Sequence, residues 1–196
     1  MREDIVKRIE ENIGVKKSIL NDAHLIDTIE RAATVVVNAI KNGNKVIFCG
    51  NGGSAADSQH LAAELIGKFY FSRRSLPAVS LTVNTSIITA IGNDFGFEKV
   101  FARQLEGIGK AGDVLIGLST SGNSENVMEA FRLAKELGIS TLAFTGESGG
   151  ILRDLADILI NVPSSDTPRI QEAHIMVGHI ICELVEKEFV VNGRQE

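Results

Sequence analysis

Residues 49–64 read CGNGGSAADSQHLAAE and directly follow a short apolar run. The run predicts a buried strand, and the pattern after the loop predicts a helix. Between them, Gly52 and Gly53 leave the main chain bare, so that a ligand can approach the backbone closely. His60 and Glu64 are four residues apart and share one face of the expected helix. This stretch predicts a strand–loop–helix unit with a small-molecule site at its loop.

The same order of elements recurs further along the chain. An apolar run leads into the hydroxyl-rich loop STSGNS at 119–124, and a helical pattern follows as far as Gly138. Strands alternate with helices at lengths typical of βαβ units, which predicts an α/β fold with a largely parallel sheet covered on both faces. The expected strands are 45–49, 77–82, 113–118, 140–144 and 157–162. The expected helices are two within 3–42, then 54–67, 85–92, 98–108, one ending at 138, and a last helix opening at Thr167–Pro168 with Thr167 as N-cap.

The two loops are expected to form one site, because each lies at the carboxyl end of a strand, where open α/β sheets bind ligands. No Pro-rich linker or low-complexity tract interrupts the 196 residues. The sequence therefore predicts a single domain over 1–196, with 1–42 as N-terminal helices.

Composition excludes several classes of function. The net charge of -5, with one Tyr, nine Phe and no Trp, disfavours binding to nucleic acid. Cys49 and Cys182 lie in apolar contexts without the spacing of metal ligands. We therefore expect both to be buried and to pack as small hydrophobic residues. The charged N-terminus carries no signal-peptide core, and no apolar stretch approaches the roughly 20 residues that span a bilayer. A cytoplasmic protein without membrane contact is expected.

A dinucleotide site is also disfavoured. Gly50, Gly52 and Ala55 fit the loose form of the fingerprint, but that motif needs an acidic residue at the end of the next strand. The chain has LTVN at 81–84 instead, so we expect no nucleotide cofactor. Ser54 with Asp57 three residues later resembles a capping box.

The hydroxyl-rich loop at 119–124 has two interpretations. Its hydroxyls, and the free N–H groups of the helix after it, suit a monophosphate. It lacks the Gly-Lys-Ser/Thr ending of an NTP-binding loop. A Ser-rich capping turn is an equally good interpretation from the sequence alone.

The last helix adds two polar residues that can face a common partner. Gln171 and His179 are two turns apart and separated by roughly 80° around the axis. If this helix meets the one that carries His60 and Glu64, the four side chains form an N/O set suited to a divalent metal such as zinc, or supply an acid and a base. A surface His–Glu pair and a buried, hydrogen-bonded His179 are the alternatives.

Five motifs together resemble the phosphoheptose isomerases of the sugar isomerase (SIS) family, from about Ile5 to Phe189. The motifs are CGNGGSAADSQHLAAEL, AIGNDFGFEKVFARQ, LSTSGNSENV, TGESGG and RIQEAHIMVGHII. The resemblance implies a three-layer αβα sandwich with a mainly parallel five-stranded sheet, assembled as a homotetramer with sites at subunit interfaces. It implies conversion of D-sedoheptulose 7-phosphate to D-glycero-D-manno-heptose 7-phosphate through an enediol. That reaction begins nucleotide-activated heptose biosynthesis, which serves lipopolysaccharide core or other surface glycans.

The resemblance also implies roles for individual residues. Glu64 and His179 take the positions of the acid/base pair, and the 1–42 helices would pack in the oligomer. The family's zinc ligands fall on His60, Glu64, Gln171 and His179. Its substrate contacts fall on Asn51, Gly52, Gly53, Glu64, Asn93, Asp94, Ser119, Thr120, Ser121, Ser124 and Gln171.

A related protein offers the alternative function. A replication-initiator-associating protein of this family is a tetrameric adaptor and has changes at the positions matching Glu64, Ser121 and His179. All three are intact here, which favours an enzyme. A sugar-phosphate-sensing regulator would normally carry a DNA-binding module, and residues 1–42 present no basic recognition face.

Overall fold

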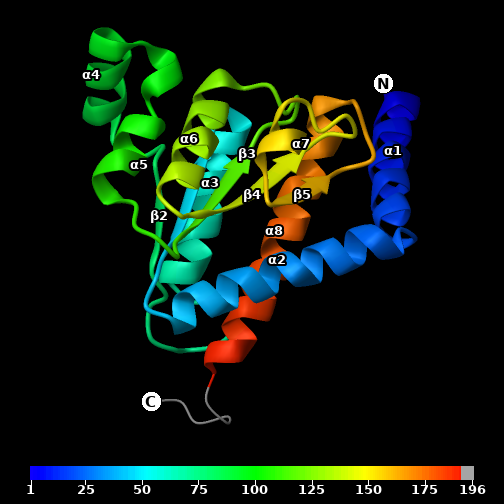
Figure 1. Ribbon diagram of the computed structural model, residues 1–196. Coiled ribbons are helices and arrows are strands. Elements are labelled where there is room, and N and C mark those ends of the chain that lie inside the picture. Colours follow the sequence, from blue (N-terminus) through cyan, green and yellow to red (C-terminus); the bar gives the residue numbers. More distant parts are fainter. Residues whose placement is uncertain (191–196) are drawn as a thin grey trace.

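A five-stranded parallel sheet forms the centre of the computed structural model, which describes residues 1–190 (Figure 1). The strand order is β2-β1-β3-β4-β5, and all neighbouring pairs are parallel. Every residue of β1 and β3 is buried, as expected of strands covered on both faces. The strands are β1 Val46–Gly50, β2 Ala78–Ser80, β3 Val114–Leu118, β4 Ser140–Thr145 and β5 Ile158–Asn161. The predicted α/β class with a parallel sheet is confirmed.

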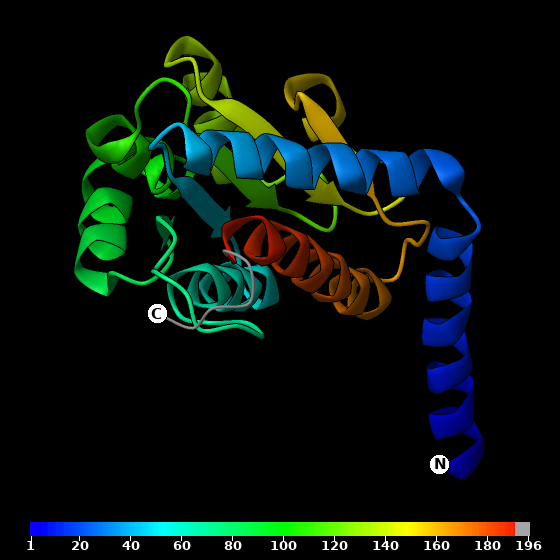
Figure 2. The ribbon, with the colours of Figure 1, turned by 90° about the horizontal axis from the view of Figure 1, so that it is seen from below.

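Helices cover both faces of this sheet (Figures 1 and 2). One apolar core joins the sheet to α2, α3 and α8, and a second core on the other face joins it to α5, α6 and α7. Alternate residues along each strand serve the two cores, because successive side chains of a strand point to opposite faces. The helices are α1 Arg2–Leu20, α2 Ala23–Lys41, α3 Gly53–Ile66, α4 Thr85–Phe95, η1 Phe97–Lys99 (a 3₁₀ turn), α5 Ala102–Ile108, α6 Glu125–Glu136, α7 Leu152–Leu155 and α8 Thr167–Phe189.

The two helices expected within 3–42 are present and are divided at Asn21–Asp22, but α1 lies crosswise to α2, so the two do not form an antiparallel hairpin (Figures 1 and 2). The Asp22 side chain caps α2 by accepting a hydrogen bond from the Leu25 N–H at 3.0 Å. α2 buries one face on the sheet, whereas α1 buries only Ile19 and projects from the body (Figure 2). Both cysteines are free and buried, as expected. None of the helices in the described residues 1–190 is long and apolar enough to span a membrane.

Two predicted helix starts and one predicted helix were wrong in detail. α3 begins at Gly53, with Gly52 at φ 55° as its N-cap, so Ser54 lies inside the helix and forms no capping box. A positive φ is open to glycine at little cost, and this lets the helix start earlier. α8 begins at Thr167, with Asp166 rather than Thr167 as N-cap. The helix expected over 98–108 is divided into η1 and α5.

The strand order creates a switch point between β1 and β3. From β1 the chain continues to β2 on one side, and from β3 it continues to β4 on the other. The helices that follow these two strands, α3 and α6, therefore lie on opposite faces of the sheet. A crevice opens at such a point beyond the carboxyl ends of the strands, and α/β proteins bind ligands there.

Candidate active site

Helices α3 and α8 pack side by side, and one glycine allows their close approach. A Cβ placed on Gly178 of α8 would lie 2.6 Å from Cδ2 of Leu61 on α3, closer than two carbons can come. The thiol of Cys182 also meets α3, 3.9 Å from the Leu61 carbonyl oxygen. This contact brings His60 on α3 opposite His179 on α8.

Three potential ligand atoms converge between these helices. Nε2 of His60 lies 3.0 Å from Oε1 of Glu64 and 3.3 Å from Nε2 of His179. The ligand atoms of all three residues lie within 4.8 Å of one another. Ligands at ~2.0 Å from a tetrahedral zinc ion are separated by ~3.3 Å, so the spacing and the N/O donor set fit a divalent metal.

The protonation of His179 fits the same role. Burial lowers the pKa of His179 below its ordinary value, and the neighbouring His60 lowers it further, while Glu64 opposes both effects. Neutral imidazole is the form that binds a metal or accepts a proton. His179 is therefore ready to do either over a wider pH range than an exposed histidine.

Gln171 lies at the other end of the contact between α3 and α8. A Cβ on Gly53 would lie 2.6 Å from Nε2 of Gln171, so this amide packs directly on the bare backbone after β1. Eight residues of helix, or about 12 Å of axis, separate Gln171 from His179. Of the four predicted metal ligands, the structure joins His60, Glu64 and His179 by contact and places Gln171 against the loop instead.

The hydroxyl-rich loop lies beyond β3, directly before α6. Its hydroxyls are organised by internal hydrogen bonds, with Oγ of Ser119 lying 2.8 Å from Oγ of Ser124 and the Asn123 N–H donating to Oγ of Ser121 at 3.1 Å. Gly122, at φ 68°, packs so closely on the TGESGG segment that a Cβ would lie 2.0 Å from the Gly149 carbonyl oxygen. The TGESGG segment thereby holds the hydroxyl-rich loop in place.

A cavity of about 420 Å³ lies next to both loops. It contains Asn51 and Ser124, which the sequence predicts as substrate contacts. Its other lining residues are Phe97, Glu98, Glu125 and Asn126, which sequence reasoning did not select. Asn126 stands within the quoted motif LSTSGNSENV, but its asparagine gave no signal of a partner elsewhere in the chain.

Asn93 and Asp94 are on α4, apart from the elements described so far. The Asn93 amide donates to its neighbour Asp94 at 2.7 Å, and α4 buries none of its residues. α4 lies on the outside of the molecule, at the opposite end from α1 (Figures 1 and 2). Within the described residues of one chain, these two predicted contacts are not joined to the His60 cluster by a hydrogen bond.

A strap between α3 and β2 covers one side of the histidine pair. The ring of Phe69 lies 5.6 Å from the ring of His179, centroid to centroid. The N–H groups of Phe69, Tyr70 and Phe71 all donate to the buried carboxylate of Glu186, at 2.7–3.2 Å. The sequence did not indicate this strap, because it depends on a contact between residues more than 100 positions apart.

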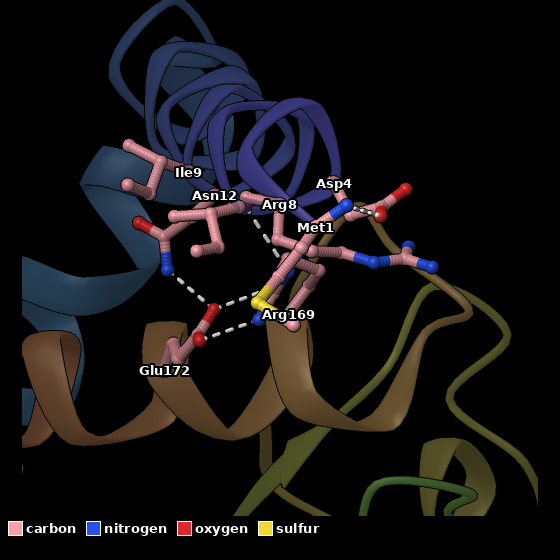
Figure 3. Close-up of a pocket in the computed structure, with 8 residues that line it drawn as sticks. Met1, Asp4, Arg8, Ile9, Asn12, Arg169 and Glu172 are labelled. Carbon is pink, nitrogen blue, oxygen red and sulfur yellow. Dashed lines mark hydrogen bonds and ion pairs between the residues drawn. The ribbon is translucent and has the colours of Figure 1, made fainter.

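A second cavity, of about 590 Å³, lies between α1 and the start of α8 (Figure 3). Arg169 donates two hydrogen bonds to Glu172 there, and Asn12 donates another to the same carboxylate. None of the residues that the sequence selected lines this cavity. It belongs to the junction of α1 with the body rather than to the candidate site.

His174 is a buried histidine of α8 that forms no part of the cluster. Its side chain is fully buried, and Nε2 lies 3.1 Å from the Thr145 carbonyl oxygen. Burial lowers the pKa of His174 from 6.5 to about 4, although the bond to Thr145 opposes the shift. Protonation therefore favours the unfolded chain. The stabilisation from neutral His174 is complete above about pH 6.5 and is lost as the pH falls toward 4.

We expect this loss to reach ~3 kcal/mol in the free energy of unfolding. Urea unfolding of the wild type and of His174→Gln over this pH range measures it, because glutamine can still donate to Thr145 but does not titrate. The free energy of unfolding should depend less steeply on pH in His174→Gln than in the wild type, and the exposed control His24→Gln should keep the wild-type dependence. Equal slopes in all three proteins would contradict the assignment.

The chain is similar to known proteins over most of its length. A family model described as SIS domain matches residues 14–146, which include both loops and α3. A phosphoheptose isomerase of Clostridium acetobutylicum is 54% identical over 188 residues, covering 96% of each chain. This alignment extends over nearly the whole chain, well beyond the range of the family model.

Two solved structures agree closely with this fold. The phosphoheptose isomerase of Neisseria gonorrhoeae has a TM-score of 0.89 at 42% identity, covering 95% of this chain and 98% of that one. The phosphoheptose isomerase of Francisella tularensis has a TM-score of 0.91 at 37% identity, covering 94% and 97%.

Proposed function

The chain belongs to the SIS domain family, in its phosphoheptose isomerase branch, and we propose that it isomerises D-sedoheptulose 7-phosphate to D-glycero-D-manno-heptose 7-phosphate. The observation that carries the proposal is the cluster of His60, Glu64 and His179, intact in a chain about half identical to named phosphoheptose isomerases. The product would enter nucleotide-activated heptose biosynthesis in the cytoplasm.

The reaction moves a carbonyl from C2 to C1 and needs a base at carbon. Glu64 removes the proton from C1 of the ketose, and an enediol forms as the carbonyl oxygen gains a proton. His179, which is neutral over a wide pH range, moves protons at oxygen. The same carboxylate then returns a proton to C2. Both groups lie on rigid helices, which holds them in register with the substrate.

The phosphate end of the substrate would be held by the loop after β3. Ser119, Thr120, Ser121 and Ser124 supply hydroxyls, and the N-terminus of the 12-residue helix α6 supplies N–H groups and a favourable dipole. Asn51, Gly52, Gly53 and Gln171 would contact the sugar chain between the two ends. His60 lies seven residues along α3 from Gly53, about 10 Å of helix axis, which suits an extended sugar phosphate.

His60, Glu64 and His179 are the residues that would hold a zinc ion, with Gln171 as the fourth ligand that the family resemblance implies. A bound divalent cation supplies Lewis-acid polarisation of the sugar oxygens. A carboxylate bound tightly to a cation is a weaker base, so Glu64 would have to exchange between these two roles.

A homotetramer is the assembly that we propose. The exposed apolar residues on α1, which include Ile5, Ile9 and Ile13, form a stripe that a single chain leaves uncovered. α4 has no fully buried residue, and only Ile88 and Ile91 pack partly against the core of the same chain. Association would cover both helices and could bring Asn93 and Asp94 to the site of a neighbouring subunit.

The proposed reaction can be followed directly by NMR. Purified protein is incubated with sedoheptulose 7-phosphate, with added zinc in one sample and a chelator in another. We expect the aldose phosphate in the first sample and a lower rate in the second. Absence of aldose in both samples would overturn the proposal and favour the adaptor function.

The metal role has its own prediction. His60→Ala and His179→Ala should each lower the zinc affinity by at least ~10-fold, since each removes a direct ligand. Calorimetric titration of zinc into the metal-free proteins measures this. The exposed control His24→Ala should bind like the wild type. Wild-type affinity in both cluster variants would remove the cluster as a metal site.

A further inference from the structure

Asn51 and Asn126 form a closed pair of side-chain amides. Nδ2 of Asn51 donates to Oδ1 of Asn126 at 2.8 Å, and Nδ2 of Asn126 donates back to Oδ1 of Asn51 at 2.9 Å. Each amide is thereby held in one orientation, because turning either one over would place its NH₂ against the other NH₂ and its oxygen against the other oxygen. Asn126 is buried, with 3% of its surface exposed.

This pair bridges the switch point of the sheet. Asn51 follows β1 directly, and Asn126 is in the first turn of α6, which follows β3 after the hydroxyl-rich loop. β1 and β3 are neighbours in register, with Gly50 opposite Leu118. Since α3 and α6 lie on opposite faces of the sheet, the amide pair is a direct link between the loops that lead into them.

The paired amides retain hydrogen-bonding capacity toward the crevice. An asparagine amide has two N–H donors and two acceptor lone pairs, and each amide of the pair uses one donor and one lone pair in this contact. Both residues line the 420 Å³ cavity together with Ser124. The remaining N–H and lone pair of Asn51 can therefore be presented to a ligand in an orientation that Asn126 determines.

We propose that Asn126 is a positioning residue, which orients the Asn51 amide toward the sugar chain and sets the spacing between the two substrate-binding loops. The inference rests on the proposed function, in which Asn51 contacts the substrate. Preorganisation of this kind matters because a ~1 Å misplacement in an active site can cost about 100-fold in rate.

The test begins with Asn126→Asp, which preserves the shape but replaces the donating NH₂ with an acceptor. The carboxylate oxygen would then oppose Oδ1 of Asn51 and break the pair. We expect kcat/KM for sedoheptulose 7-phosphate to fall about 100-fold in folded protein. Asn38→Asp, the same change at an exposed position of α2, should leave it unaltered.

A double-mutant cycle separates positioning from a purely structural role. If Asn126 acts through Asn51, then Asn126→Ala should lower kcat/KM in the wild-type background but cause no further loss in the Asn51→Ala background, with circular dichroism verifying the fold of each variant. A double variant whose loss of kcat/KM equals the product of the two single losses would overturn the inference. A near-wild-type kcat/KM in Asn126→Asp would also overturn it. An inactive wild type would instead overturn the proposed function itself.

Discussion

Replacing Glu64 with glutamine is expected to lower kcat for sedoheptulose 7-phosphate by about 10²- to 10⁴-fold, the usual contribution of a general base. Glutamine has nearly the same size but cannot accept a proton from carbon at neutral pH. Substrate affinity should change little, because the proposed function assigns the phosphate to the loop after β3 rather than to the His60 cluster. Turnover is followed by NMR and binding by calorimetry.

Two further measurements test whether the loss of turnover arises at the removal of the C1 proton. Glu136→Gln, an exposed change near the end of α6, should leave kcat unchanged. Exchange of the C1 hydrogen with deuterium oxide should disappear in Glu64→Gln, since enediol formation begins with loss of that proton. A Glu64→Gln variant with wild-type turnover would remove Glu64 from the mechanism.

The sheet could be predicted from the sequence because its strands carry strong patterns. The runs that became β1 and β3 are nearly continuous in apolar residues, which is what two-sided burial requires. The boundaries were less accurate. β2 is limited to Ala78–Ser80, although the expected run was 77–82, and α3 starts at Gly53 because glycine at position 52 permits a positive φ.

The candidate site was only partly predictable, for a different reason. His60 and Glu64 share a helix face by their spacing alone, so local geometry is sufficient to pair them. The approach of His179 depends on the packing of Gly178 against Leu61, which no local pattern encodes. From the sequence, only the family resemblance groups His179 with His60 and Glu64.

Hydrogen bonds between buried polar groups could not be predicted from the sequence. Asn51 and Asn126 are separated by 75 positions, and Phe69 and Glu186 by 117. Asparagine and glutamate are usually surface residues, so their types alone predict exposure. Only the fold places them together, and there each becomes a specific hydrogen-bonding partner.

Glu186→Ala is expected to lower the free energy of unfolding by about 3–5 kcal/mol, the cost of removing one partner from a buried ion pair. The Glu186 carboxylate is fully buried and lies 3.1 Å from Nε of Arg73, as an ion pair without the alignment of a hydrogen bond. Burial favours a higher pKa for Glu186, but the strap N–H groups and Arg73 outweigh it and lower the pKa. The charged form is therefore the stable one.

The variant would also leave Arg73 without its counter-charge. The Arg73 guanidinium donates to the carbonyl oxygens of Glu64 and Leu65 in the last turn of α3, both at 2.9 Å. It thereby satisfies acceptors that the end of a helix leaves free. Loss of Glu186 would loosen this cap and release the strap N–H groups together, which places the expected cost above that of a single hydrogen bond.

Urea unfolding at one fixed protein concentration measures this effect, because association also contributes to stability. Glu188→Ala is the matched control, since Glu188 is two residues further on α8 and pairs with Lys41 at 2.7 Å on the exposed surface. An exposed pair contributes ~0–1 kcal/mol. If Glu186→Ala cost no more than this control, the buried carboxylate would not be what holds the strap, and the position of Phe69 beside His179 would need another cause.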